Sequence, residues 1–232
     1  GTETRKYPYD DLFAHVVGYT YQGGTGLESS QNYNLLTSDS FILDQIKWEF
    51  QDLKKKGDNI ITTLDVDVQK ALSSAIGDYK GAAVAIEADT GRVLAMVSKP
   101  DFDPNTVQKK YEKLSTDEDN SPLLNRATSG LYPPGSTFKI VTSLAYYRQY
   151  GEPNGFSYDC DGEITVDDHT IHCYKNETHG LQNFTELFAN SCNAGFASVG
   201  LTIKKNEFTS AADSLLFNAD LPSPVRYKSS RF

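Results

Sequence analysis

The clearest pattern along the chain is a pair of apolar runs separated by a polar turn. Residues 81–86 and 93–97 are almost continuously apolar, and Asp89-Thr90-Gly91 lies between them. This pattern predicts a β-hairpin, because glycine supplies the positive φ that a tight turn requires. Since apolar residues occupy both faces of the runs, we expect helices to cover this sheet on each side.

Apolar residues recur three and four positions apart in several other segments, which predicts helices. These segments are residues 66–76, 138–150, 184–188 and 196–203. Asp65 is a good N-cap for the first of them, and Gly77 is a typical terminator. Thr185 or a neighbouring residue is expected to start the third. Together with the hairpin, these helices predict a mixed α/β (α+β) fold.

The first sixty residues differ in composition from the rest, being rich in tyrosine, glycine and polar residues. Residues 15–19 predict a short strand, and the alternation of Ile46, Trp48 and Phe50 predicts a second, half-buried one. We therefore expect a mostly β accessory region followed by a larger domain. The predicted domains are residues 1–60 and residues 61–232.

Charge and hydropathy argue against two kinds of partner or setting. The 232 residues carry 22 Lys and Arg against 31 Asp and Glu, a net charge of −9, which argues against nucleic acid as a ligand. No run approaches the roughly eighteen apolar residues of a membrane span, and no leader opens the chain. Any targeting or anchoring segment is therefore expected to lie upstream or to have been removed.

Ser136 and Lys139 form the first candidate for chemistry. A helix that starts at or beside Ser136, after Pro133-Pro134-Gly135, carries Lys139 on the same side and within reach of the hydroxyl. A helix N-terminus disfavours a cation by about 0.3–1 kcal/mol, so this lysine breaks a local rule. The same field, with desolvation, would lower the pKa of Lys139 towards that of a general base. The alternative is an N-cap serine with an incidental lysine.

Ser191-Cys192-Asn193, between the two short helices, is the second candidate. In an extended linker, residues two apart point the same way, so the Ser191 hydroxyl and the Asn193 amide would face one cleft. Serine and asparagine are also common in turns between helices, which is the competing structural interpretation.

Cysteine and histidine residues crowd into the otherwise irregular stretch of residues 152–180. They are Cys160, His169, His172, Cys173 and His179. With Cys192 the cysteine count is three, so at most one intramolecular disulfide can form, and Cys160 with Cys173 is the plausible pair in an oxidising compartment. Zinc is an alternative, but the spacings contain no C-x2-C or H-x3-H pair. We expect structural loop residues, with no metal and no cofactor.

Ser-x-x-Lys followed by Ser-x-Asn resembles the motif order of penicillin-recognising enzymes. Longer runs extend the resemblance to class B penicillin-binding proteins. These runs are residues 60–69, 90–98, 103–105, 124–127 and 132–139. Residues 14–19 and 26–28 resemble the end of that family's pedestal domain, so the resemblance covers nearly the whole chain.

The resemblance implies the penicillin-binding transpeptidase fold, with helices on both faces of a mostly antiparallel sheet. Residues 1–60 would be the C-terminal part of a β-rich pedestal or linker domain, and residues 61–232 the N-terminal part of the transpeptidase domain. The family's third motif, Lys-Thr-Gly or Lys-Ser-Gly, does not occur in the sequence; Lys228-Ser229-Ser230 lacks the glycine. We therefore expect a fold that is incomplete at its C-terminus, with an unfinished sheet edge that favours self-association.

The implied activity is that of a peptidoglycan D,D-transpeptidase, which cross-links stem peptides through a serine acyl-enzyme and is inhibited by β-lactams. By resemblance, Ser136 is acylated, Lys139 takes its proton, and Ser191 relays a proton to the leaving amine. Asn193 would hold the substrate's amide backbone, and the Ser136 N–H would supply half of an oxyanion hole. Without the third motif, the chain by itself is expected to be weakly active or inactive.

The resemblance also implies partners and a location. Expected partners are peptidoglycan stem peptides, β-lactam antibiotics and membrane-embedded proteins of cell-wall synthesis, at the extracytoplasmic face of a bacterial membrane. The alternatives are a β-lactam-sensing binding domain and a serine β-lactamase. The pedestal-like first sixty residues argue against the sensor, and β-lactamases usually lack such a region.

Overall fold

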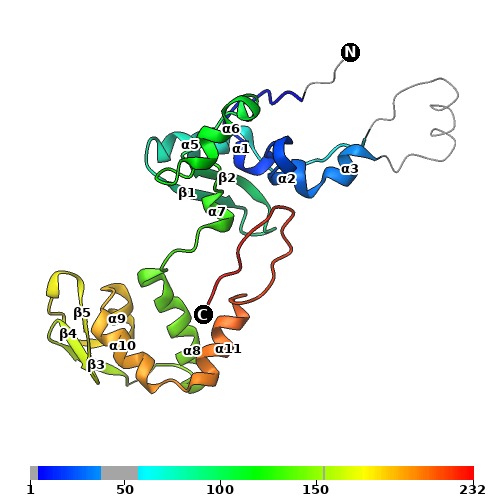
Figure 1. The fold of residues 1–232 in the computed structure, drawn as a ribbon. Helices are drawn as coiled ribbons and strands as arrows, with labels where there is room; N and C mark the ends of the chain where they lie inside the picture. The colour runs from blue at the N-terminus through cyan, green and yellow to red at the C-terminus, as the bar shows by residue number, and fades with distance from the viewer. Residues whose placement is uncertain (1–4, 38–56, 154) are drawn as a thin grey trace, which may run out of the picture. The chain divides into compact units, whose positions relative to one another are not determined.

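The computed structural model describes residues 5–37, 57–153 and 155–232. The chain forms two compact units, residues 1–130 with 222–228, and residues 131–221 with 229–232. Figure 1 shows the elements of each unit. The strand predicted around Trp48 lies outside the described residues. The domain boundary predicted at residue 60 does not coincide with this division and stays a prediction.

The predicted hairpin is the sheet of the first unit. β1 (Gly81–Ile86) pairs antiparallel with β2 (Val93–Lys99). The register shifts at a bulge between Ala85 and Ile86, next to the turn. The two apolar runs therefore form two strands, as predicted.

The helix α5 (Val66–Ile76) begins and ends where the sequence predicts. The carboxylate of Asp65 accepts hydrogen bonds from the backbone N–H groups of Asp67 and Val68. Gly77 follows the last helical residue with φ +57°, a conformation that favours glycine. Both ends are thus set by the two residues that carried the prediction.

Gln69 fixes α5 against the outer edge of β2. Its side chain is 1% exposed, and its amide donates to the backbone carbonyls of Leu12 and Met96 at 2.8 and 2.9 Å. Its oxygen accepts from the Met96 N–H at 2.8 Å. The side chain therefore pairs with Met96 as a neighbouring strand would, and it satisfies backbone groups of a buried strand edge.

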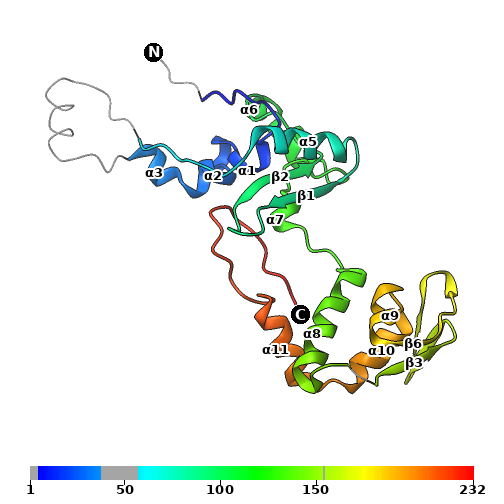
Figure 2. The same ribbon diagram turned by 180° about the vertical axis from the view of Figure 1, so that it is seen from behind.

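The short helix α7 (Arg126–Ser129) also packs on the hairpin. The Ser98 hydroxyl joins it to β2, because it donates to the Leu124 carbonyl at 3.0 Å and accepts from the Arg126 N–H at 2.9 Å. Figures 1 and 2 both show the hairpin between α5 and α7. The prediction of helices on each side of this sheet is therefore confirmed.

Residues 14–36 contain four short helical segments, where the sequence predicted a mostly β region. They form α1 (Ala14–Val17), η1 (Tyr21–Gly23), α2 (Gly26–Ser30) and α3 (Asn32–Leu36). The strand predicted at residues 15–19 is wrong. Val16 and Val17 favour strands, but packing overrides that propensity in so short a segment. The chain turns at Gly18, where φ is +81° and a Cβ would lie 1.9 Å from the Thr25 carbonyl oxygen.

The core of the first unit has an aromatic part and an aliphatic part. Tyr19 stands edge-on to Phe102 with ring centroids 5.6 Å apart, beside the buried start of α6 (Val107–Thr116). In the aliphatic part, Val225 packs with Val16 and Leu27, which explains why residues 222–228 belong to this unit.

The second unit contains helices and two small sheets. Its elements are η2 (Gly135–Phe138), α8 (Lys139–Tyr150), β3 (Ser157–Cys160), β4 (Glu163–Val166), β5 (His169–His172), η3 (Tyr174–Asn176), β6 (Gly180–Asn183), α9 (Phe184–Ala189), α10 (Asn193–Thr202) and α11 (Lys205–Ser214). β3 pairs with β6, and β4 with β5, both antiparallel. The stretch of residues 152–180, expected to be irregular, therefore carries short strands.

A buried cluster joins α8, α9 and α10. Leu187 and Val199 are completely buried, and the rings of Tyr146, Phe184 and Phe196 pack beside them. This core holds the N-terminal ends of α8 and α10 in the same part of the unit. None of the helices in the described ranges is both long and apolar enough to cross a membrane.

Candidate active site

Ser136 lies in the 3-10 turn that leads into α8. Gly135, directly before it, has φ +58°, and Ser136 itself is exposed. Lys139 is the first residue of α8, and its side chain is only 8% exposed. The turn and the helix therefore place an accessible hydroxyl beside a buried amine.

The Lys139 amine is surrounded by four oxygen atoms. Its Nζ lies 3.1 Å from Ser136 Oγ and 3.0 Å from Ser191 Oγ. It also lies 2.8 Å from the Ser191 carbonyl oxygen and 2.7 Å from Asn193 Oδ1. The structure thus brings together all four residues that the sequence analysis selected.

The chemistry of these oxygens suits a neutral amine. A carbonyl or amide oxygen can only accept, so Ser191 O and Asn193 Oδ1 can take the two N–H groups of a neutral Lys139. A hydroxyl can donate as well as accept, so the nitrogen lone pair is left for the proton of a serine hydroxyl. The arrangement can therefore receive a proton from Ser136, which is what a general base does.

The environment also favours the neutral form of Lys139. Burial lowers the pKa of its amine, and the cysteines at 192 and 173 oppose this shift only in part. The four oxygens around Nζ come from hydroxyl, carbonyl and amide groups, none of which is a carboxylate. The direction of the shift is the one predicted from the sequence.

Ser191 occupies a strained turn between α9 and α10. Its φ is +52°, unusual for a residue with a side chain, so the linker is not extended as the sequence interpretation assumed. The Ser191 hydroxyl nevertheless donates to Ser136 Oγ at 2.8 Å. The expected convergence of the motifs is present, but a turn and the start of α10 produce it.

Asn193 connects the site to the β4–β5 hairpin. Its amide nitrogen donates to the backbone carbonyl of His172 at 2.9 Å, while its oxygen accepts from Lys139. An amide nitrogen carries two N–H groups, so one of them remains for a ligand carbonyl. The contribution of His172 is a backbone atom, and no side-chain pattern in the sequence could reveal it.

Phe196 and Cys192 also contact or adjoin this group, a role that the sequence did not reveal for either residue. Lys139 Nζ lies 5.8 Å from the centre of the Phe196 ring, and Phe196 is one helical turn along from Asn193 on α10. Cys192 is completely buried, and its sulfur accepts from the Gly195 N–H at 3.2 Å, which caps α10. Phe196 was recognised only as part of an apolar helix face.

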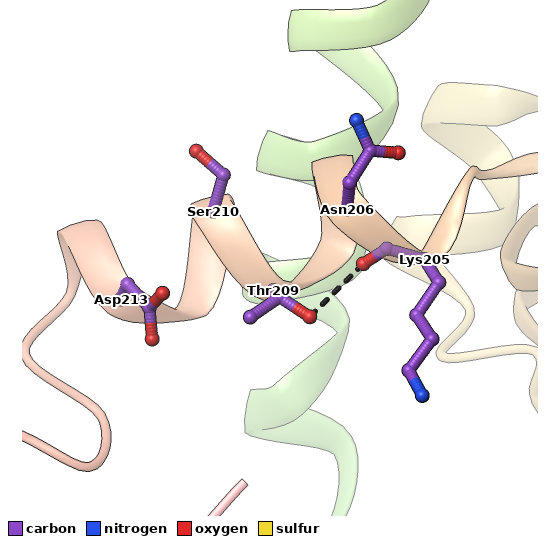
Figure 3. A pocket seen from close by; sticks show the side chains of 5 residues that line it. All are labelled: Lys205, Asn206, Thr209, Ser210 and Asp213. Atoms are coloured by element: carbon purple, nitrogen blue, oxygen red, sulfur yellow. Dashed lines mark hydrogen bonds between the residues drawn. The ribbon is translucent and has the colours of Figure 1, made fainter.

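A separate hollow of about 600 Å³ lies on α11. Its lining residues are Lys205, Asn206, Thr209, Ser210 and Asp213. Figure 3 shows that all five come from one helix, where the Thr209 hydroxyl donates to the Lys205 carbonyl at 3.0 Å. It lacks an arranged nucleophile and base, and the Ser136 group is the stronger candidate site.

The fold and this group of side chains define the class of penicillin-recognising proteins with a reactive serine and a lysine beside it. The family model described as Transpeptidase, "Penicillin binding protein transpeptidase domain", matches residues 81–229. The chain belongs to this family.

Curated relatives and solved structures agree with this assignment. Peptidoglycan D,D-transpeptidase PbpA of Mycolicibacterium smegmatis is 34% identical over 95% of this chain and 48% of its own length. Peptidoglycan D,D-transpeptidase MrdA of Acinetobacter baumannii is 30% identical over 83% of this chain and 34% of its own length. The chain thus spans half or less of the length of these relatives.

Solved structures show the same fold. The D,D-transpeptidase domain of a peptidoglycan glycosyltransferase from Eggerthella lenta has a TM-score of 0.85 and 29% identity, over 100% of this chain and 52% of that one. Penicillin-binding protein A from M. tuberculosis, solved as an imipenem acyl-enzyme complex, has a TM-score of 0.89 and 27% identity. That match covers 98% of this chain and 57% of the other.

Proposed function

We propose that the protein is a peptidoglycan D,D-transpeptidase with Ser136 as its nucleophile. The observation that carries this proposal is the position of Lys139 Nζ, 3.1 Å from Ser136 Oγ and enclosed by neutral oxygens. The names of the relatives, which are D,D-transpeptidases, and the acyl-enzyme structures of penicillin-binding protein A support the same reaction class.

In the first half-reaction Ser136 Oγ attacks the carbonyl carbon of the penultimate D-Ala of a stem peptide. Lys139, neutral at this moment, takes the hydroxyl proton as the new ester bond forms. The peptide C–N bond then breaks, and a proton passes through Ser191 to the leaving D-Ala amine. Ser191 suits this relay because its hydroxyl hydrogen-bonds Ser136 and lies 3.0 Å from Lys139.

In the second half-reaction an amine of a neighbouring stem peptide attacks the ester. The bond between the acyl carbon and Ser136 Oγ breaks as the new amide forms. The proton released by the amine returns to the serine oxygen. Asn193 supports both steps by holding the amide backbone of the substrate with its remaining N–H. The Ser136 backbone N–H provides one donor to the developing oxyanion.

A β-lactam mimics the D-Ala-D-Ala unit and leaves a stable acyl-enzyme. Two other functions use the same acylation: a β-lactam sensor, which transfers no peptide, and a serine β-lactamase, which hydrolyses the ester quickly. A transpeptidase releases D-Ala from a D-Ala-D-Ala peptide and transfers the peptide's acyl group to an added amine. A sensor does neither, so this assay distinguishes the two. A long-lived penicilloyl ester separates it from the β-lactamase.

The proposed setting is the extracytoplasmic face of a bacterial membrane, where stem peptides are cross-linked. Membrane-embedded proteins of cell-wall synthesis are the proposed partners. The location is tested by treating intact cells with a protease that cannot cross the membrane. A protein on the outer side of the membrane is cleaved, whereas one on the cytoplasmic side is protected.

A further inference from the structure

A close contact between α9 and α10 lies beside the turn that joins the two helices. Leu187 of α9 is completely buried, and its side chain lies against the backbone of Gly195 on α10. A Cβ at position 195 would lie only 2.2 Å from Leu187 Cδ2 and 3.1 Å from Leu187 Cδ1. We propose that Leu187 and Gly195 are positioning residues, whose contact fixes the start of α10 against α9. The turn held in this way carries Ser191 and leads into Asn193.

The lack of space, and not the backbone conformation, explains a glycine at position 195. Gly195 lies inside α10 and its φ is not in the left-handed range, so alanine would be the more favourable residue there on helix propensity alone. Gly200 of the same helix differs, because no atom of the described residues lies within 4 Å of the position that its Cβ would take. Of the two glycines, only Gly195 permits a close approach of another helix.

Leu187 also holds the turn through its backbone. Its carbonyl accepts a hydrogen bond from the Cys192 N–H at 2.9 Å, and the carbonyl of Phe188 accepts one from the Ser191 N–H at 3.1 Å. These two bonds tie Ser191, with its unusual φ of +52°, to the last turn of α9. Leu187 therefore contacts the chain on both sides of Asn193, through its carbonyl before this residue and through its side chain after it.

The Leu187 side chain has little room to move aside. It belongs to a buried cluster with the rings of Phe184 and Phe196 and the side chain of Val199, and protein interiors are close-packed with few voids. A Cβ at position 195 would therefore push the start of α10 away from α9. Carbon atoms in contact lie about 3.5–4.0 Å apart, so relieving the overlap requires a movement of more than about 1 Å.

A movement of that size would act directly on the contacts of Lys139. Asn193 Oδ1 and Ser191 Oγ lie 2.7 and 3.0 Å from Lys139 Nζ. Hydrogen bonds from nitrogen to oxygen span about 2.7–3.2 Å, so a shift of about 1 Å breaks them. A misplacement of about 1 Å can cost about 100-fold in reaction rate. This consequence for acylation rests on the proposed function, in which Ser136 is the nucleophile and Lys139 its base.

The Gly195→Ala variant tests the contact, and Gly200→Ala is its matched control, because it makes the same change in the same helix without an overlap. We expect Gly195→Ala to slow penicillin labelling of Ser136 about 10-fold or more, and Gly200→Ala to label at the wild-type rate. The final extent of labelling separates positioning from folding. A positioning defect lowers the rate but still reaches one label per chain, whereas a folding defect alone lowers the extent and leaves the rate unchanged.

A compensating substitution and the pH profile test the same contact. Leu187→Val removes about as much volume as Gly195→Ala adds, so the double variant should label within about 3-fold of the wild-type rate. Burial lowers the pKa of Lys139, so a displaced turn that admits water should raise it. The midpoint of the labelling rate against pH should therefore move towards 10.5 in Gly195→Ala and return in the double variant.

Amide hydrogen exchange, followed by NMR, tests the positioning without acylation. The N–H groups of Ser191 and Cys192 should exchange faster in Gly195→Ala than in the wild type, and at the wild-type rate in Gly200→Ala. A wild-type protein without label on Ser136 would contradict the proposed function, and the exchange would then decide the positioning by itself.

Two results would overturn the positioning role. One is wild-type exchange in Gly195→Ala together with a wild-type labelling rate, and the other is a reduced extent of labelling at an unchanged rate. If Gly195→Ala does not fold, the double variant with Leu187→Val decides. It should fold and label within about 3-fold of the wild-type rate, and its failure to do so would also overturn the proposal.

Discussion

Lys139 donates its shortest hydrogen bond, 2.7 Å, to the side-chain oxygen of Asn193. This contact joins the start of α8 to the start of α10, two helices whose first residues are far apart in the sequence. It fixes one N–H of the lysine on an atom that can only accept. The lysine lone pair is thereby directed to the hydroxyl groups of Ser136 and Ser191.

Replacing Lys139 should abolish acylation while leaving the fold intact. Lys139→Met should slow labelling by a fluorescent penicillin about 100-fold or more, because a general base contributes at least that factor. Lys139→Arg should fail equally, since a guanidinium remains protonated. Lys204→Met, at the exposed start of α11, is the matched control and should label normally.

The pH dependence of acylation should report the shifted pKa of Lys139. Burial lowers that pKa from the ordinary value of 10.5, so the neutral, active fraction rises at lower pH than for an exposed lysine. The rising limb of the labelling rate should therefore have its midpoint below 10.5. A midpoint at or above the ordinary lysine value would contradict the role assigned to this amine.

Gln69 should be one of the most sensitive positions for stability. Gln69→Leu keeps the size of the side chain but leaves the Met96 N–H and the carbonyls of Leu12 and Met96 without their partner. The free energy of unfolding of the first unit should fall by about 3 kcal/mol in urea titrations. Lys70→Leu, at the next, exposed position of the same helix, should change it by less than about 0.5 kcal/mol.

His15 should make the first unit less stable in mild acid. Burial lowers the pKa of His15 from 6.5 to about 4, so between these values the unfolded chain binds a proton that the folded chain does not. The contribution of neutral His15 to the free energy of unfolding is therefore fully present above pH 6.5, and it declines as the pH falls towards 4. At pH 5 the loss is about 2 kcal/mol.

The His15→Gln variant isolates this effect from other titrations. Urea unfolding of both proteins at pH 7.5 and pH 5 should show a smaller pH-dependent loss in the variant. His169→Gln, at an exposed histidine, should retain the wild-type dependence. An unchanged pH dependence in His15→Gln would remove His15 as the cause.

The outer edge of β1 should promote self-association of the 232-residue chain. Among the described residues β1 pairs only with β2, and Val84 and Ile86 are 42% and 59% exposed. Val84→Lys should shift the chain towards monomer in light scattering, because a charge on an edge strand opposes further pairing. Ile171→Lys, at an equally exposed residue of β5, should leave the association unchanged.

The parts of the fold that the sequence predicted are those set by neighbouring residues. Asp65 and Gly77 bound α5 through their own side chain and φ, and the turn at Asp89-Thr90-Gly91 closes the hairpin. The proximity of Ser136 and Lys139 could also be predicted from the sequence, because one helical turn connects them. Local chemistry was sufficient in each case.

The parts that were missed depend on contacts between distant segments. Residues 14–17 form a helical turn despite the strand propensity of their valines, and the chain then passes close to Thr25 at Gly18. The Cys160 and Cys192 sulfurs meet only after several turns have formed, so their spacing carried no recognisable signal. Such contacts are properties of the packed unit.

The proposed mechanism requires that Ser136 is the residue that becomes acylated. Intact-protein mass spectrometry after incubation with penicillin, followed by peptide mapping, identifies the acylated residue. We expect one penicilloyl group per chain on Ser136, and none in the Ser136→Ala variant. A Ser136→Ala protein that is still acylated at the wild-type rate would contradict the mechanism.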